Sequence, residues 1–277
     1  MRQLVRSRCA EHFPVEPCML LNEQATVADV KATFMDVAAL AKTGDLVIFT
    51  FSGHGAWIRA LPHTQTVGVP HQATGYAGPL WFHPTIVLFD RMMMDDEWRV
   101  VWSAFADGVA VVTMFDSCVS GTAPISNFFG QELDRSKFAP TPQPPASRSR
   151  RDRRTRTTGL EAIAKTYLRH RETYIRIEKT LSSVADYGVI GLHFGACLDS
   201  QVADEGPHGG YFTVAIQQAL EHAPASLSYE QLYADVRKRL EREGLQQTPT
   251  LVPFGVAHRG LLSEPVFGVR RKAAVLT

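Results

Sequence analysis

Two short motifs carry side chains that can perform nucleophilic chemistry. The first reads SGHG at residues 52–55 and the second reads DSC at residues 116–118, and each directly follows an uncharged run of apolar residues. A thiolate is a strong nucleophile, and an imidazole beside it can act as general acid and base. The two motifs therefore predict that Cys118 is a nucleophile and His54 is its partner.

The apolar runs before these motifs predict the strands that position them. Leu46–Phe51 and Val109–Phe115 are uncharged throughout, whereas a strand with one solvated face would alternate polar and apolar residues. Such strands, separated by a helix, are typical of a parallel sheet covered on both faces. Because ligands bind outside the carboxyl ends of parallel strands, we expect His54 and Cys118 at the same edge of one sheet.

The rest of the chain alternates in the same way and predicts an α/β protein. With 277 residues, 45% of them hydrophobic, the chain can bury the core of one large domain, and we expect residues 1–277 to form a single domain. The expected helices are Thr26–Lys42, Asp96–Ala106, Tyr211–Ala223 and Ser228–Gly244, the further strands are Thr85–Phe89 and Val189–Phe194, and a long loop covers Ala56–Pro84.

Composition excludes several classes of protein. A net charge of +1 favours neither nucleic acid nor a membrane surface, and no continuous apolar run reaches the roughly 18 residues of a membrane span. The N-terminus has no apolar segment typical of a secretory signal. The cysteines have no CxxC spacing, which predicts reduced thiols and a cytoplasmic protein; they are Cys9, Cys18, Cys118 and Cys197.

The segment 123–180 has a different composition from the rest of the chain. It contains four prolines at 140–145, and residues 148–156 hold six arginines against one aspartate. Such a block cannot bury itself, so we expect a flexible, solvated insert. Arginines can neutralise phosphates, but no aromatic residues alternate with them, and the block does not favour nucleic acid.

Taken singly, Cys118 could be a cysteine of the apolar core and His54 a histidine with a structural role, because both situations are common for these residue types. Only the pairing of His54 and Cys118 at two strand ends favours catalysis. The other histidines, among them His83 and His193, have no such context and are interpreted as ordinary.

Several stretches together resemble one family. SGHG, then DSCVSG in place of the usual D-x-C-H-S-G, is similar to the catalytic pair of the metacaspase and orthocaspase branch of the caspase-like cysteine peptidases. DDEW at 95–98 resembles the family's D-D-E-L. The stretches HFGACLDSQVADEGPHGGYFTVAIQQAL and SYEQLYADV…QQTPTL resemble its later segments, so the likeness covers most of the chain between Leu20 and Leu251.

This resemblance implies a three-layer α/β/α sandwich with a mostly parallel central sheet. It also implies a cysteine endopeptidase that cuts after Arg or Lys, with Cys118 and His54 as catalytic residues and the backbone N–H groups of Gly55 and Cys118 as the oxyanion hole. Ser52 and Asp116 would line the pocket for the basic side chain. The alternative for Asp116 is an N-cap on a helix that follows its strand.

The chain departs from the family in three places. Val119 replaces the histidine after the cysteine. The family's calcium site matches Asp95 and Asp96, with Asp90 as a further candidate, but Ile125 stands where another aspartate is usual. We therefore expect no required cofactor, with calcium as a candidate; the alternative is a solvated carboxylate pair that caps the helix at Asp96.

The third departure concerns the first strand. Nothing before Leu20 resembles the family's opening strand, so either the chain starts upstream or the domain lacks a central strand. In the second case the alternative function is a catalytically silent module that binds peptides or partners. The insert lies where caspase-like enzymes separate their large and small parts. If the enzyme is active, we therefore expect self-cleavage between Arg148 and Arg156.

Overall fold

A computed structural model describes residues 18–59, 82–118, 153–181, 187–198, 201–256 and 259–268. The helical elements in chain order are η1 (Asn22–Gln24), α2 (Val27–Leu40), α3 (Asp95–Ser103), α4 (Arg153–Leu181), α5 (Tyr211–Glu221), α6 (Tyr229–Arg242) and α7 (Arg259–Leu262). The strands are β1 (Leu46–Ser52), β2 (Gly55–Arg59), β3 (Phe82–Val87), β4 (Met92–Met94), β5 (Ala110–Asp116), β6 (Ile190–Gly195), β7 (Glu205–Gly206), β8 (Gly209–Gly210) and β9 (Thr250–Gly255).

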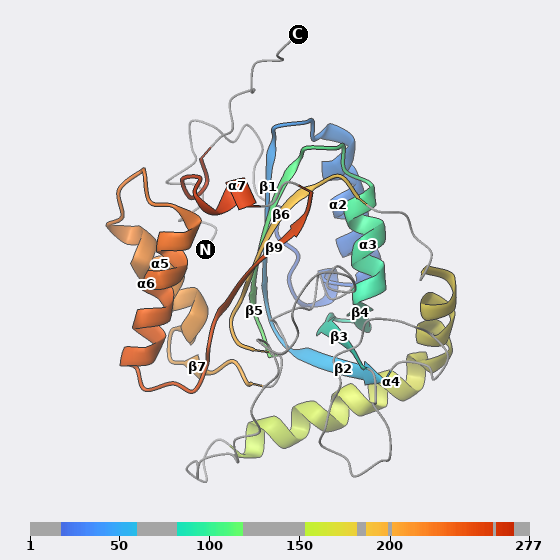
Figure 1. Cartoon of the computed structure of the whole chain (residues 1–277). Helices are drawn as coiled ribbons and strands as arrows, with labels where there is room; N and C mark the ends of the chain where they lie inside the picture. The colour runs from blue at the N-terminus through green and yellow to red at the C-terminus, as the bar shows by residue number, and fades with distance from the viewer. Residues whose placement is uncertain are drawn as a thin grey trace, which may run out of the picture.

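The central sheet has the order β1-β5-β6-β9 and stands between two groups of helices (Figure 1). The first three strands run parallel, and β9 pairs antiparallel with β6. The predicted strands at 46–51, 109–115 and 189–194 are confirmed to within a residue or two. The α/β class, the mostly parallel sheet and the layers of helices are confirmed as well.

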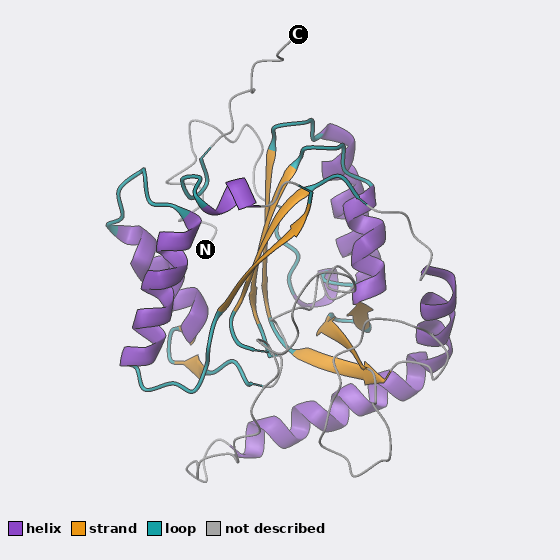
Figure 2. Ribbon diagram, viewed as in Figure 1, coloured by secondary structure: helices purple, strands orange, loops and turns teal. Residues whose placement is uncertain are grey.

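Each face of the sheet has its own apolar core, and β5 contributes to both. Its residues point alternately to opposite faces, so Val111 and Phe115 pack with α2 and α3, while Val112 and Met114 pack with α5 and α6. All seven residues of β5 are buried. Figure 2 shows the resulting order of helix, sheet and helix. Burial on both faces is the reason for the continuous apolar runs in the sequence.

Helix starts follow local sequence signals. The Thr26 side chain accepts a hydrogen bond from the backbone N–H of Asp29 at 3.1 Å, so the predicted N-cap of α2 is confirmed. Ser228 and Gln231 form a reciprocal capping box at the start of α6. These caps satisfy backbone donors that have no partner inside the helix.

Two expectations about loops are wrong for the part of each segment that the structure describes. The predicted loop 56–84 starts and ends in strands, because β2 pairs with β3 and β3 with β4 in a small antiparallel sheet. The predicted flexible insert, 123–180, contains the long helix α4. Its apolar side Ile163, Tyr167, Tyr174 and Ile177 packs on the small sheet. Residues 123–152 of the insert lie outside the described residues.

Strand β1, at the edge of the described central sheet, is paired on one side only. In the described ranges β1 pairs only with β5, and its residues are half-buried or exposed, unlike those of β5. Residues 1–17 are not described, so the expectation of a missing first strand stays a prediction.

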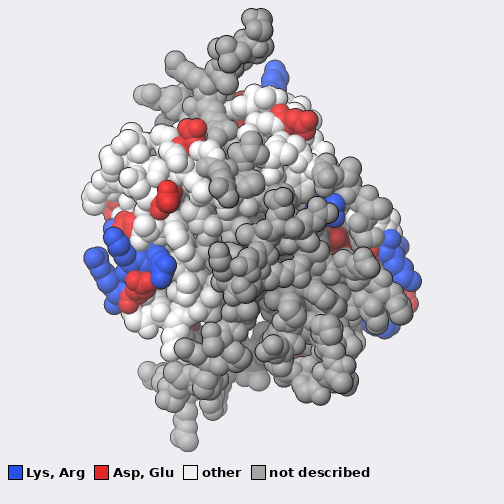
Figure 3. All heavy atoms as spheres, viewed as in Figure 1, with Lys and Arg blue, Asp and Glu red and all other residues white. Residues whose placement is uncertain are grey.

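The described surface mixes charges of both signs. On the face shown in Figure 3, Lys and Arg lie beside Asp and Glu over α5 and α6, where Arg237 pairs with Glu241 and Arg239 with Asp235. None of the helices in the described ranges combines the length and apolar character that crossing a membrane requires. The arginines at 148–152 lie outside the described part of the chain.

Candidate active site

The carboxyl ends of β1 and β5 bring the two motifs together. In the parallel register Ser52 is opposite Asp116, and the backbone N–H of Gly53 donates to the carbonyl of Asp116 at 3.2 Å. His54 and Cys118 each lie two residues beyond this pair. The topology thus places the histidine and the cysteine at one edge of the sheet, on adjacent strands.

The backbone around His54 lies against the backbone of Cys118. Any side chain at position 55 would collide with the carbonyl oxygen of Cys118, so only glycine permits this approach. The carbonyl of His54 accepts a hydrogen bond from the N–H of Val87 at 2.8 Å, which holds it to the small sheet. His54 is exposed and Cys118 is half-buried, so both are within reach of a substrate.

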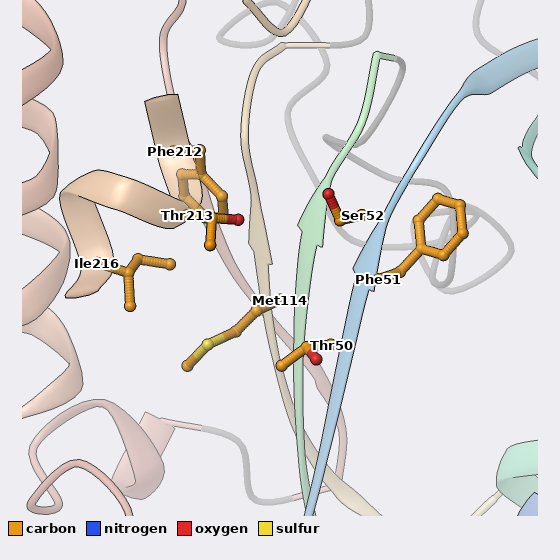
Figure 4. Close-up of a pocket in the computed structure, with 7 residues that line it drawn as sticks. All are labelled: Thr50, Phe51, Ser52, Met114, Phe212, Thr213 and Ile216. Atoms are coloured by element: carbon orange, nitrogen blue, oxygen red, sulfur yellow. The ribbon is translucent and has the colours of Figure 1, made fainter. Parts of the chain in front are cut away.

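A pocket opens beside these strand ends, between the sheet and α5. Its lining side chains are Thr50, Phe51, Ser52, Met114, Phe212, Thr213 and Ile216. Figure 4 shows Phe212, Thr213 and Ile216 on α5 and Ser52 on the opposite wall. Ser52, predicted to line a substrate pocket, is one of these residues. Asp116 is next to the pocket because it is paired with Ser52 and bonded to Thr213.

Asp116 is a buried carboxylate held by the start of α5. Its Oδ2 accepts hydrogen bonds from the backbone N–H of Thr213 at 2.9 Å and from the Thr213 hydroxyl at 2.5 Å. Burial raises the pKa of Asp116 above its usual value, while the Thr213 hydrogen bonds pull it down and the charge of Glu205 adds to the rise. Within the described residues, the helix N-terminus that Asp116 contacts belongs to α5, which lies far along the chain.

Hydrogen bonds connect the segment that follows β6 with Ser117, the residue before Cys118, and with the turn that precedes β9. The thiol of Cys197 is near the carbonyl oxygens of Ser117, at 3.6 Å, and Gln201, at 3.5 Å. The side-chain oxygen of Gln201 accepts from the N–H of Leu198 and from the N–H of Thr248. The end of β6 is therefore tied both to the residue before Cys118 and to the turn before β9.

The predicted metal residues Asp95 and Asp96 lie elsewhere, in a buried cluster between the small sheet and α4. Their side chains are 2% and 1% exposed, so the alternative of a solvated pair is wrong. His83 Nδ1 lies 2.8 Å from an oxygen of Asp95, and His83 Nε2 lies 3.4 Å from an oxygen of Glu178 on α4. The histidine that the sequence presents as ordinary is thus the centre of a charged cluster.

Whether this cluster suits calcium depends on its donors. Ligand atoms of His83, Asp95 and Asp96 lie within 4.8 Å of one another. Calcium prefers six to eight oxygen ligands, whereas the imidazole of His83 faces one of the two aspartates. The further candidate Asp90 accepts a hydrogen bond from the N–H of Val27 at 2.8 Å and so binds the start of α2. The described residues therefore fit calcium poorly, and calcium stays a prediction.

Comparison with known proteins assigns the family. The family model of the caspase domain matches residues 8–254, which contain both strand ends and α5. The chain belongs to the caspase domain family. Membership implies cysteine peptidase activity on protein or peptide substrates.

A solved structure gives the same fold. The crystal structure of protein GSU0716 from Geobacter sulfurreducens is 23% identical in sequence, with a TM-score of 0.66 over 97% of this caspase domain chain and 88% of its own. At that identity the likeness concerns the fold alone. No curated protein sequence matches the chain significantly.

The structure adds residues to the site that the sequence did not single out. Thr213 and Gln201 lie within the stretch whose resemblance to the family was noted, so a sequence signal existed, but nothing in the spacing showed their contacts. His83 had no such signal, because Asp95 is 12 residues away and Glu178 comes from α4.

Proposed function

We propose that this caspase domain is a cysteine endopeptidase of the metacaspase and orthocaspase type that cleaves after Arg or Lys. The observation that supports it best is the register of β1 with β5, which leaves His54 and Cys118 at the same sheet edge. The contact between Gly55 and the backbone of Cys118 supports it further. A nucleophile and a base at paired strand ends are the arrangement from which a catalytic dyad can be built.

The chemistry of this proposal uses the dyad in two stages. The thiolate of Cys118 attacks the peptide carbonyl carbon, and His54 protonates the leaving amine as the C–N bond breaks. A water molecule, deprotonated by His54, then attacks the thioester and releases the acid. The N–H groups of Gly55 and Cys118 stabilise the oxyanion, and one such donor is typically worth about 100-fold or more in rate.

The preference for a basic residue rests on the carboxylate of Asp116 beside the pocket. A buried carboxylate that retains a charge binds a guanidinium or ammonium group by charge-assisted hydrogen bonds. Ser52 and Thr213 supply polar groups on the walls, and the remaining lining is largely apolar. Apolar walls suit the aliphatic stem of Arg or Lys.

Self-processing belongs to the same proposal. Residues 148–156 hold six arginines, and they immediately precede or begin α4. Tethering to the domain raises their effective concentration at the active site. We expect a nick between Arg148 and Arg156, after which β5 and β6 still pair and keep the fragments together. Cytoplasmic location also stays a prediction, which cell fractionation tests.

The second candidate is a caspase-like module that binds peptides without cutting them. The open side of β1 favours it, because within the described ranges this strand has no partner there. An incomplete sheet would leave the pocket without one of its walls.

One set of measurements separates the two. Purified protein is incubated with fluorogenic peptides ending in Arg, Lys or Asp, alongside Cys118→Ala and Asp116→Asn. The Asn side chain keeps an oxygen that can accept from Thr213 but removes the charge. We expect cleavage of the Arg and Lys peptides that depends on Cys118, and its loss in Asp116→Asn while alkylation of Cys118 continues. Absence of any Cys118-dependent cleavage would favour the binding module.

A further inference from the structure

The long helix α4 binds the small antiparallel sheet through one buried tyrosine. The hydroxyl of Tyr174 accepts a hydrogen bond from the backbone N–H of Met92 on β4 at 3.1 Å, and Tyr174 is 2% exposed. The buried cluster that contains Tyr174 also includes Ala56, Ile58 and Met94. Figure 1 shows α4 lying along β2, β3 and β4. Tyr174 therefore combines an apolar contact with a specific hydrogen bond to the sheet.

Backbone contacts lead from this hydrogen bond to the candidate catalytic histidine. Met92 is opposite Val87 in the register of β4 with β3. The N–H of Val87 in turn donates to the carbonyl oxygen of His54 at 2.8 Å. Tyr174 is thus joined to the backbone of His54 through only two residues, Met92 and Val87, which come from neighbouring strands of the small sheet.

His54 depends on this support because of its place between the two sheets. It follows β1 of the central sheet and precedes β2 of the small sheet, and its side chain is exposed. An exposed side chain is held by its backbone more than by packing. On the central side the N–H of Gly53 donates to the carbonyl of Asp116 at 3.2 Å, and on the other side the carbonyl of His54 binds Val87. A shift of the small sheet would therefore move His54 relative to Cys118.

We propose that Tyr174 is a positioning residue for the peptidase reaction, and that it acts through Met92 and Val87 to hold the backbone of His54 in place beside Cys118. This inference rests on the proposed function, since it concerns the histidine of the same dyad. It assigns α4 a role in the reaction, although α4 packs on the far side of the small sheet from the central sheet and its pocket.

Loss of the Tyr174 hydroxyl should be felt at His54 because Met92 is fully buried. A buried N–H without a hydrogen-bond partner is costly, so β4 would shift or open to give the Met92 N–H another partner. Since β4 is paired with β3, the same movement reaches Val87 and the carbonyl of His54. A misplacement of about 1 Å in a catalytic geometry can cost about 100-fold in rate.

The first experiment compares Tyr174→Phe with Tyr167→Phe. Tyr167 is a matched control, because its ring stacks on Tyr174 at 5.7 Å between ring centroids and the substitution removes the same atom from the same helix. In Tyr174→Phe we expect kcat for a peptide ending in Arg to fall about 10-fold, while KM stays within about 2-fold because the pocket beside α5 is untouched. Tyr167→Phe should match the parent. An unchanged kcat, or an equal loss in the control, would overturn the proposal.

The second experiment needs no turnover and keeps this test separate from the proposed function. In the Cys118→Ala background, NMR follows amide hydrogen exchange at Val87, and at Ala196, whose N–H donates to the carbonyl of Phe115 in the central sheet. We expect Tyr174→Phe to speed exchange at Val87 about 10-fold and to leave Ala196 unchanged.

These amides distinguish the possible failures. If the parent protein cleaves nothing, faster exchange at Val87 still supports the link from Tyr174 to His54, and only the catalytic proposal fails. Unchanged exchange at Val87 would refute the link whatever the peptidase activity. Equal acceleration at Ala196 would show a general loss of stability, and would refute a positioning role for Tyr174 as well.

Discussion

The histidine in the buried acidic cluster gives a prediction about stability. His83 is 1% exposed, and its two ring nitrogens lie near carboxylates from different elements, Asp95 at the start of α3 and Glu178 on α4. Burial alone lowers the pKa of His83, but the charge of Asp95, the hydrogen bond to Asp95 and the nearby carboxylate of Glu178 outweigh it and raise the pKa to about 11. The side chain is therefore a cation between two buried anions.

Replacement by glutamine keeps a similar volume and removes the charge. Breaking one side of a buried pair leaves an uncompensated charge, which typically costs about 3–5 kcal/mol. We expect His83→Gln to lower the free energy of unfolding by this amount. His222→Gln changes an exposed histidine at the end of α5 and should stay within about 0.5 kcal/mol of the parent.

The pH dependence gives a second readout. The folded-state pKa of His83 lies above the unfolded value of 6.5, so the stabilisation is complete below about pH 6.5 and is lost as pH rises toward 11. The native state binds the extra proton, so stability falls with pH by about 1.4 kcal/mol per unit in this window. Between about pH 7 and pH 9 the parent should lose about 3 kcal/mol more than His83→Gln.

Urea denaturation followed by circular dichroism measures both effects. The Cys118→Ala background excludes the proposed self-cleavage from the experiment. A loss below 1 kcal/mol in His83→Gln, or the same pH dependence in parent and variant, would refute the assignment of a buried imidazolium. The comparison of the two proteins removes the titration of the groups that do not contact His83.

Three shorter predictions concern other parts of the molecule. Gly55→Ala should reduce kcat/KM for an Arg peptide at least about 100-fold, because its methyl group would displace the Cys118 backbone from the proposed oxyanion hole, whereas a rate near that of the parent would show that the backbone yields. Ser228→Ala removes the side-chain cap of α6 and should lower the free energy of unfolding in urea by about 1 kcal/mol. No measurable change would mean that water binds the backbone N–H of Gln231 in place of the Ser228 hydroxyl. A chelator should leave Cys118-dependent cleavage intact, since the cluster at Asp95 holds an imidazole rather than a full set of oxygen ligands, and restoration by added calcium after chelation would contradict this.

Local patterns in the sequence were sufficient for the main elements. The helix at 27–40 and the strands at 46–52 and 110–116 follow from periodicity, an N-cap and uncharged runs, all of which act over a few residues. The pairing of His54 with Cys118 at one edge followed from a general property of parallel sheets rather than from any distance along the chain.

Features that depend on distant partners could not be predicted in this way. Residues 161–181 have a polar, arginine-bearing composition that favours an exposed segment, yet Tyr174 is 2% exposed because the small antiparallel sheet offers an apolar surface to one side of α4. The role of His83 likewise depends on Glu178, which lies on α4, far along the chain.

The sequence by itself determined the class of fold and the pair of residues expected to react, because hydrophobic periodicity and strand-end motifs are local. The tertiary structure decided the environment of each charge. Burial and the charge of Glu205 raise the pKa of Asp116, while the hydrogen bonds from Thr213 lower it. Glu205 on β7 and Thr213 on α5 come nearly 100 residues later in the chain. Electrostatic interactions depend on distance in space and on exclusion of water. Neither quantity is encoded in the spacing of residues along the chain.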